Sequence, residues 1–306
     1  MAAAAEVGCS LKLASLLLFS ALSAHATTFC VTIAGLGGEP EYEQRFATWA
    51  KEIDQTLKGA GSEVKSETLS GPDATRARFR AALESIAKEA KPQDSLVVMM
   101  IGHGSFDNVD YKINLPGPDV SATELAALLD RISAGRQLVV NMTSASGGSV
   151  HALQKPNRTV ITATRTGSEK NATVFARYWV EALRDASADT DKNEVITALE
   201  AFKYAELKTK QFYETQKRLS TEHAALDGGN QQGPLLAARF PLLRIGSIQN
   251  AAKDPAKQAL LAKREQLEAQ IDQLKFQKAA TPTDEYKKRI SVLLLELART
   301  QAELDK

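Results

Sequence analysis

The chain has 306 residues, of which 43% are hydrophobic and 25% are charged, as is typical of globular proteins. Its formal net charge is only +1, so no overall field favours nucleic acid or an anionic membrane as a partner. This length allows one medium-sized domain with an appendage, or two small domains.

The first 26 residues have the three-part pattern of a secretory signal peptide. Lys12 precedes an apolar run over residues 13–22, and Ala24-His25-Ala26 follows as a cleavage signal of small residues. A buried N-terminal helix is the alternative, but such a helix seldom ends in this signal. The run is too short for a transmembrane helix, which needs about 20 residues. We therefore expect Thr27 to start an exported protein, periplasmic or extracellular, with no membrane span after leader removal.

Residues 27–248 alternate between apolar runs and amphipathic stretches, with Cys30 as their only cysteine. The expected strands cover residues 29–34, 63–69, 96–101, 138–141 and 159–163, and the expected helices cover residues 42–57, 73–88, 123–132 and 173–184. Because the apolar runs are continuous, we expect these strands to be buried on both faces. Alternating strands and helices of this kind predict an α/β fold with three layers and a mostly parallel sheet.

Residues 251–306 contain no glycine and are dominated by Lys, Glu, Gln, Leu and Ala. Two helical stripes are expected, one over residues 260–274 and one over residues 286–304. Pro282 separates them, since proline ends a helix. This composition predicts a helical hairpin or coiled-coil arm that contacts a protein partner or self-associates. A solvated helical face is the alternative explanation for its interleaved charges.

Two motifs with chemical potential follow the ends of consecutive predicted strands. His103 and Gly104 follow the strand at 96–101, and Ser144, Ser146 and Gly147 follow the strand at 138–141. In parallel sheets the carboxyl ends of the strands form the binding edge, so these residues should lie together. A backbone N–H such as that of Gly104 can stabilise a developing oxyanion.

This arrangement resembles the caspase/legumain clan of cysteine peptidases, which carries His-Gly after one strand and Cys-x-Ser-Gly after the next. The runs at residues 35–42 and 162–169 also look like exported bacterial members of its legumain-like branch. The resemblance implies a polypeptide ligand and no required cofactor. It also implies a catalytic role for His103 and Gly104, and substrate contacts for Ser146 and Gly147. Arg165 and Glu169 follow the strand at 159–163, where related peptidases build a specificity pocket; a surface ion pair is the alternative.

The sequence departs from the clan at the nucleophile, because Ser144 stands where the cysteine is expected. Met142 replaces an acid that clan members often carry. A histidine alone can generate a thiolate, but a serine hydroxyl needs an oriented base. We therefore expect a peptidase homologue with weak or no proteolysis. The alternatives are a non-catalytic scaffold acting through its arm, and an active serine hydrolase using Ser144 and His103.

A calcium loop is the last candidate site. Asp189, Asp191, Asn193, Val195 and Glu200 occupy positions one, three, five, seven and twelve of an EF-hand-like pattern, so bound calcium is an expectation. Glu194 stands at the sixth position, where the pattern needs glycine. A simple helix cap, in which Thr197 pairs with Glu200, is the competing explanation.

Overall fold

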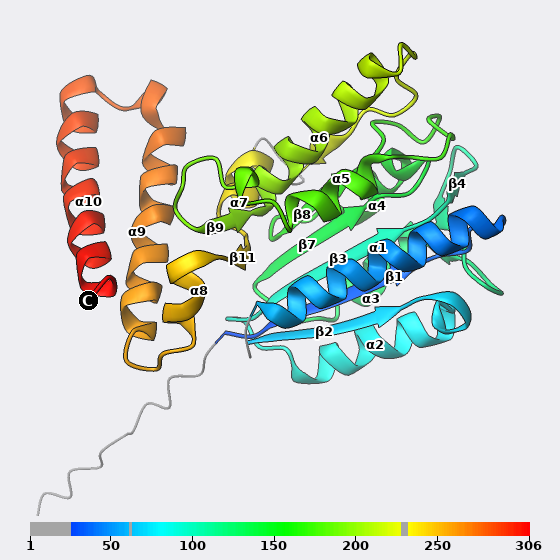
Figure 1. The fold of residues 1–306 in the computed structure, drawn as a ribbon, viewed down its shortest axis with the longest axis horizontal. Coiled ribbons are helices and arrows are strands. Elements are labelled where there is room, and N and C mark those ends of the chain that lie inside the picture. Colours follow the sequence, from blue (N-terminus) through cyan, green and yellow to red (C-terminus); the bar gives the residue numbers. More distant parts are fainter. Residues whose placement is uncertain (1–25, 61–62, 228–231) are drawn as a thin grey trace, which may run out of the picture.

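A computed structural model describes residues 26–60, 63–227 and 232–306, so nearly all of the predicted leader lies outside the described residues. Six strands form the central sheet in the order β10-β8-β7-β3-β1-β2 (Figure 1). Their bounds are β1 Thr28–Ala34, β2 Val64–Leu69, β3 Ser95–Ile101, β7 Arg136–Asn141, β8 Arg158–Thr162 and β10 Ala225–Asp227. All neighbouring pairs are parallel except β10 with β8.

Helices cover both faces of this sheet, which gives the three layers predicted from the sequence. One face carries α1 Pro40–Gly59, α5 Phe175–Ala182 and α6 Ala198–Thr215. The other face carries α2 Arg76–Glu89, α3 Ala122–Leu129 and α4 Val150–Leu153. Successive residues of β3 alternate between the two cores, and all seven are buried. Cys30 is buried in the first core as a free thiol, and burial raises its pKa to about 12.

Two small antiparallel sheets flank the central one. β4 Gly104–Phe106, β5 Tyr111–Ile113 and β6 Val120–Ser121 form a meander directly after His103. β9 Val195–Thr197 pairs with β11 Pro241–Arg244 near α7 Gly233–Ala238. These short strands were absent from the sequence-based prediction.

The C-terminal helices form the predicted helical hairpin. The chain passes through α8 Gly246–Ala252 into α9 Gln258–Phe276, and α10 Thr283–Leu304 returns beside α9 (Figure 1). Pro282 directly precedes α10, as expected of a residue that cannot continue α9. None of the helices in the described part of the chain is both long and apolar enough to cross a membrane.

Candidate functional site

Strand register brings the two predicted motifs to one edge of the sheet. β3 and β7 are adjacent and parallel, with Met100 opposite Asn141. The Met142 N–H extends this ladder by donating to the Met100 carbonyl over 2.9 Å. Both strands end at this point, and His103 and Ser144 follow two or three residues later. The two residues therefore lie side by side. The placement expected from the carboxyl-end rule therefore holds.

The His103 ring packs into an aromatic corner of α1. Its centroid lies 4.9 Å from that of Tyr42 and 5.3 Å from that of Phe46, and both contacts are edge-on. Burial lowers the pKa of His103, although a hydrogen bond with the Gly37 backbone and nearby acidic groups oppose this. The geometry therefore favours a neutral imidazole held by α1 and the loop after β1.

Ser144 is directed at Gly104, the residue that follows this histidine. The Gly104 N–H donates to Ser144 Oγ over 3.0 Å, and the hydroxyl donates to the Gly104 carbonyl over 3.1 Å. Ser144 is only 2% exposed. Among the described residues, no hydrogen bond joins the His103 ring to Ser144 Oγ. The Ser144 hydroxyl thus makes its hydrogen bonds with backbone groups, and no base in the described part of the chain accepts its proton.

Gly104 is required by this close approach. A Cβ built on it would lie 2.5 Å from the Tyr111 ring and 2.6 Å from the Ser144 carbonyl oxygen. Any side chain at position 104 would therefore push the two segments apart. The glycine is needed to bring the β4 backbone onto Ser144.

A buried hydroxyl network fixes the backbone that leads to Ser144. Tyr111 Oη lies 2.5 Å from Thr143 Oγ1 and donates to Asn141 Oδ1 over 3.2 Å. The Asn141 amide in turn donates to Ser149 Oγ over 3.1 Å. Because all four side chains are buried, each lost bond would leave an unsatisfied polar group, which costs about 1–3 kcal/mol.

The segment after Ser144 is bound to the loop that follows β8. Thr164 N–H donates to Ser146 Oγ over 3.0 Å, and Gly147 N–H donates to Thr164 Oγ1 over 2.9 Å. Ser146 is fully buried, so its role in the described structure is to hold this loop. Ala145 adopts a left-handed φ of 55°, and its N–H donates to the Glu169 carbonyl over 2.8 Å. Ser146 Oγ and the Gly147 N–H thus both make hydrogen bonds within the protein, and the substrate contacts expected of these two residues stay a prediction.

Glu169 pairs with a histidine instead of the arginine considered in the sequence. Its carboxylate lies 2.8 Å from His223 Nδ1 and accepts the backbone N–H groups of Arg165 and His223 over 3.0 and 3.1 Å. The exposed Arg165 side chain forms no ion pair in the described part of the chain. Glu169 therefore braces two loops of the strand-end edge, and Arg165 remains free to meet a ligand.

Sequence reasoning missed several residues that shape this edge. Tyr42 belongs to the run at 35–42 that carried part of the resemblance, yet nothing in the sequence placed it against His103. Nothing in the sequence links His223 to Glu169, and only the fold brings the two residues together. Tyr111 lies on a strand of three residues, too short to give a periodic signal.

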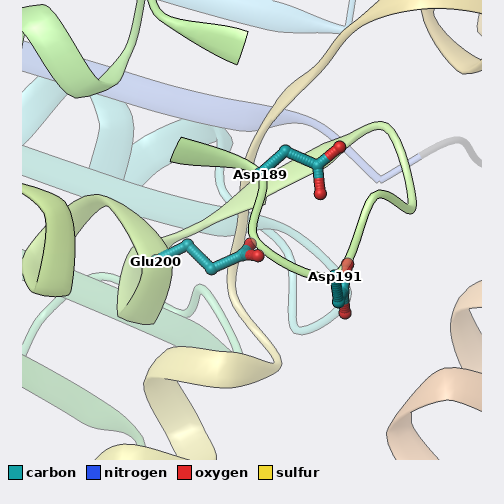
Figure 2. A group of neighbouring side chains, drawn as sticks. All are labelled: Asp189, Asp191 and Glu200. Carbon is teal, nitrogen blue, oxygen red and sulfur yellow. The ribbon is translucent and has the colours of Figure 1, made fainter. Parts of the chain in front are cut away.

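The predicted calcium loop forms an acidic cluster far along the chain from this edge. Carboxylate oxygens of Asp189, Asp191 and Glu200 lie within 4.8 Å of one another (Figure 2). Burial and the charges of its two neighbours raise the pKa of Asp191. The capping box is also present, since Thr197 Oγ1 accepts the Glu200 N–H while Glu200 accepts the Thr197 N–H. Three expected ligands therefore converge, but one of them already caps α6.

The sixth loop position has the conformation that usually calls for glycine. Glu194 adopts a φ of 63°, and its carboxylate accepts the Ser247 hydroxyl and, over 3.0 Å, the Ile248 N–H. These bonds to the first turn of α8 offset the strain of a left-handed non-glycine residue. Asn193 donates to Asp191 and to Glu268 of α9, each over 3.4 Å. The loop is thus linked both to the start of α8 and to helix α9 of the arm.

Comparison with known proteins identifies similar folds at low sequence identity. No family model matches the chain, and no curated protein matches it. Caspase-1 from Spodoptera frugiperda is 11% identical with a TM-score of 0.47, and the match covers 66% of this chain and 86% of that one. The Drosophila initiator caspase Dronc is 11% identical with a TM-score of 0.44, covering 67% and 80%. Protein GSU0716 from Geobacter sulfurreducens is 14% identical with a TM-score of 0.48, covering 72% and 99%. Such similarity assigns no residue a role, so function rests on the side chains themselves.

Proposed function

We propose that this chain is an exported peptidase-like protein that binds a polypeptide segment at the His103–Ser144 edge and has weak or no proteolytic activity. The reciprocal pair of hydrogen bonds between Ser144 and Gly104 carries this proposal. Acyl transfer would need Ser144 Oγ to attack, His103 to move its proton and the Gly104 N–H to stabilise the oxyanion. In the described geometry the Gly104 N–H already binds the serine oxygen, and the imidazole is bound elsewhere.

The low acidity of a serine hydroxyl limits the catalytic activity of this arrangement. A hydroxyl is far less acidic than a thiol, so it becomes a nucleophile only when a base accepts its proton in the transition state. The Gly104 carbonyl accepts that hydrogen bond here, and a carbonyl oxygen is no general base. Ser144 is therefore better suited to holding the β4 backbone than to attacking a peptide bond.

The rim of the site suits a polypeptide ligand. Leu36 and Val109 are apolar side chains in loops at this edge, and they are 42% and 89% exposed. Ser105 and Arg165 are exposed beside Ser144 and Gly147. Apolar and charged groups spread over several loops match an extended ligand better than a compact polar one.

Selection from a random peptide library tests the binding role. Wild-type protein should enrich a sequence family, whereas Ser105→Trp should abolish enrichment by filling the rim. Arg165→Glu should change the charge of the enriched peptides. Lys88→Trp, at the opposite end of the sheet in the last turn of α2, is the matched control and should behave as wild type. Enrichment that survives Ser105→Trp and Arg165→Glu unchanged would place ligand binding elsewhere.

A scaffold function through the arm is the second candidate. Val292, Leu294 and Leu295 of α10 are large apolar residues with about half of their surface exposed. An exposed group of this kind is typical of an interaction surface. Removal of α9 and α10 with retained peptide enrichment would separate this function from that of the strand-end edge.

A further inference from the structure

Within the described part of the chain, helix α10 packs mainly against α9, and only its last residues, around Leu304, also reach α8. It lies at the outer side of the molecule with α9 between it and the α/β domain (Figure 1). Its residues that face α9 at Tyr286, Ile290, Leu293 and Leu297 are only partly buried. A helix gains most of its stability by packing an apolar face against its neighbours. Packing mainly against α9 leaves part of the apolar surface of α10 exposed.

A second face of α10 combines apolar and charged residues at helical spacing. Positions separated by three or four residues lie on one side of a helix. Such a series is formed by Lys288, Val292, Leu295, Arg299 and Glu303. Val292 and Leu295 at its centre are 55% and 54% exposed. We name this series the outer stripe.

The charged side chains of the outer stripe have no ion-pair partner among the residues that the structure describes. Lys288, Arg299 and Glu303 form no ion pair with any described residue, although α10 carries a pair between Arg289 and Glu285 at 3.4 Å. The stripe has the cation Lys288 at its start, and the cation Arg299 and the anion Glu303 near its end. A helix running antiparallel to α10 with the same stripe would complement it.

We propose that the outer stripe is the interface of a two-fold symmetric dimer in which α10 packs antiparallel on α10 of a second copy. With the axis next to Leu295, Lys288 of each copy faces Glu303 of the other. Leu295 meets its counterpart, and Val292 packs on the aliphatic stem of Arg299. Such an interface is isologous, so every favourable contact occurs twice. In such a dimer the two α10 helices lie between the two α9 helices, and each α10 packs antiparallel on both of its neighbours.

Charge exchange tests the partner and the register together. Sedimentation of the full mature chain should show a dimer for the wild type. Lys288→Glu and Glu303→Lys should each raise the dimer dissociation constant about tenfold or more, because like charges then face each other twice. Both changes in one chain should restore wild-type affinity. Lys287→Glu is the control, because this exposed lysine lies on another side of α10.

Leu295→Asp provides a second measurement that does not depend on ion pairs. It should leave a folded monomer, with helix content by circular dichroism equal to that of the wild type. A wild-type chain that stays monomeric at every concentration would overturn the proposal and favour a different protein as the partner. Failure of the double charge exchange to restore affinity, or a dimer unchanged by Leu295→Asp, would also overturn it.

Discussion

Gly104 and Ser144 exchange two hydrogen bonds across the end of the sheet, one over 3.0 Å from the glycine N–H and one over 3.1 Å from the serine hydroxyl. The resemblance to caspase/legumain peptidases implies that this N–H stabilises the oxyanion and that position 144 holds the nucleophile. In this chain the two groups satisfy each other instead. Serine-based activity would require both bonds to break and a base to accept the Ser144 proton.

Cleavage of the leader before Thr27 would create a specific contact at the new N-terminus. The Thr27 N–H donates to Asp94 Oδ1 over 2.8 Å, and Asp94 is nearly fully buried. A terminal ammonium at this position would form a charge-assisted bond, worth about 1.5–3 kcal/mol. N-terminal sequencing of exported protein should begin at Thr27. Urea denaturation should show the mature chain to be more stable than a chain that retains Ala26.

Asp94→Asn should remove that difference in stability, whereas Asp73→Asn should preserve it. A full-length protein recovered from the cytosol would contradict export. If the mature chain and the chain that retains Ala26 were equally stable, the ammonium would add nothing to the Thr27–Asp94 contact.

Glu222 should make folding stability depend on pH. Its carboxylate accepts the Val174 and Phe175 N–H groups and the Tyr213 hydroxyl, and burial raises the pKa of Glu222 from 4.5 to about 7. The folded state therefore keeps a proton that the unfolded state releases. Stability from this group is full below pH 4.5 and is lost as the pH rises to about 7, on the order of 3 kcal/mol in total.

Glu222→Gln isolates that contribution. The difference in unfolding free energy between wild type and variant, measured by urea denaturation, should change steadily across this pH window. Glu206→Gln, an exposed position on the neighbouring α6, should give a difference that does not vary with pH. A constant difference for Glu222→Gln as well would mean that this carboxyl ionises as easily when folded as when unfolded.

The acidic loop predicts a thermal response to calcium. Binding to the native state alone stabilises by about 2.7 kcal/mol at a hundredfold excess over Kd. Millimolar calcium should raise the melting temperature, Asp191→Ala should abolish the rise, and Asp254→Asn outside the loop should preserve it. Glu194→Gly should keep the response, since glycine accepts the left-handed φ. If calcium leaves the melting temperature unchanged, Glu200 acts only as the cap of α6.

The central sheet could be predicted because its strands are continuous apolar runs between amphipathic helices. The same topology placed His103 and Ser144 together, since adjacent parallel strands end at one edge. The meander containing Tyr111 could not be predicted, because its strands are only two or three residues long. The direction of the Ser144 hydroxyl could not be predicted from the sequence either. It depends on the close approach of Gly104, which tertiary packing alone determines.

The structure of the C-terminal arm could likewise be predicted only in part. The two helices and the break at Pro282 follow from composition and periodicity. Their attachment combines a buried apolar cluster, which includes Val195 and Leu261, with polar contacts from distant parts of the chain, such as Arg244 to Glu265 and buried Arg264 to the Asn193 carbonyl. Nothing in the spacing of these residues indicates that they meet.

Active-site labelling of wild-type protein tests the central claim most directly. A fluorophosphonate should leave Ser144 unmodified, because its hydroxyl is bound to Gly104 and has no base. Ser144→Cys should become reactive toward an electrophilic peptide probe, since a thiolate can form beside a histidine, and His103→Ala should remove that reactivity. Strong fluorophosphonate labelling of wild type at Ser144, lost in His103→Ala, would show a working serine hydrolase and contradict the account.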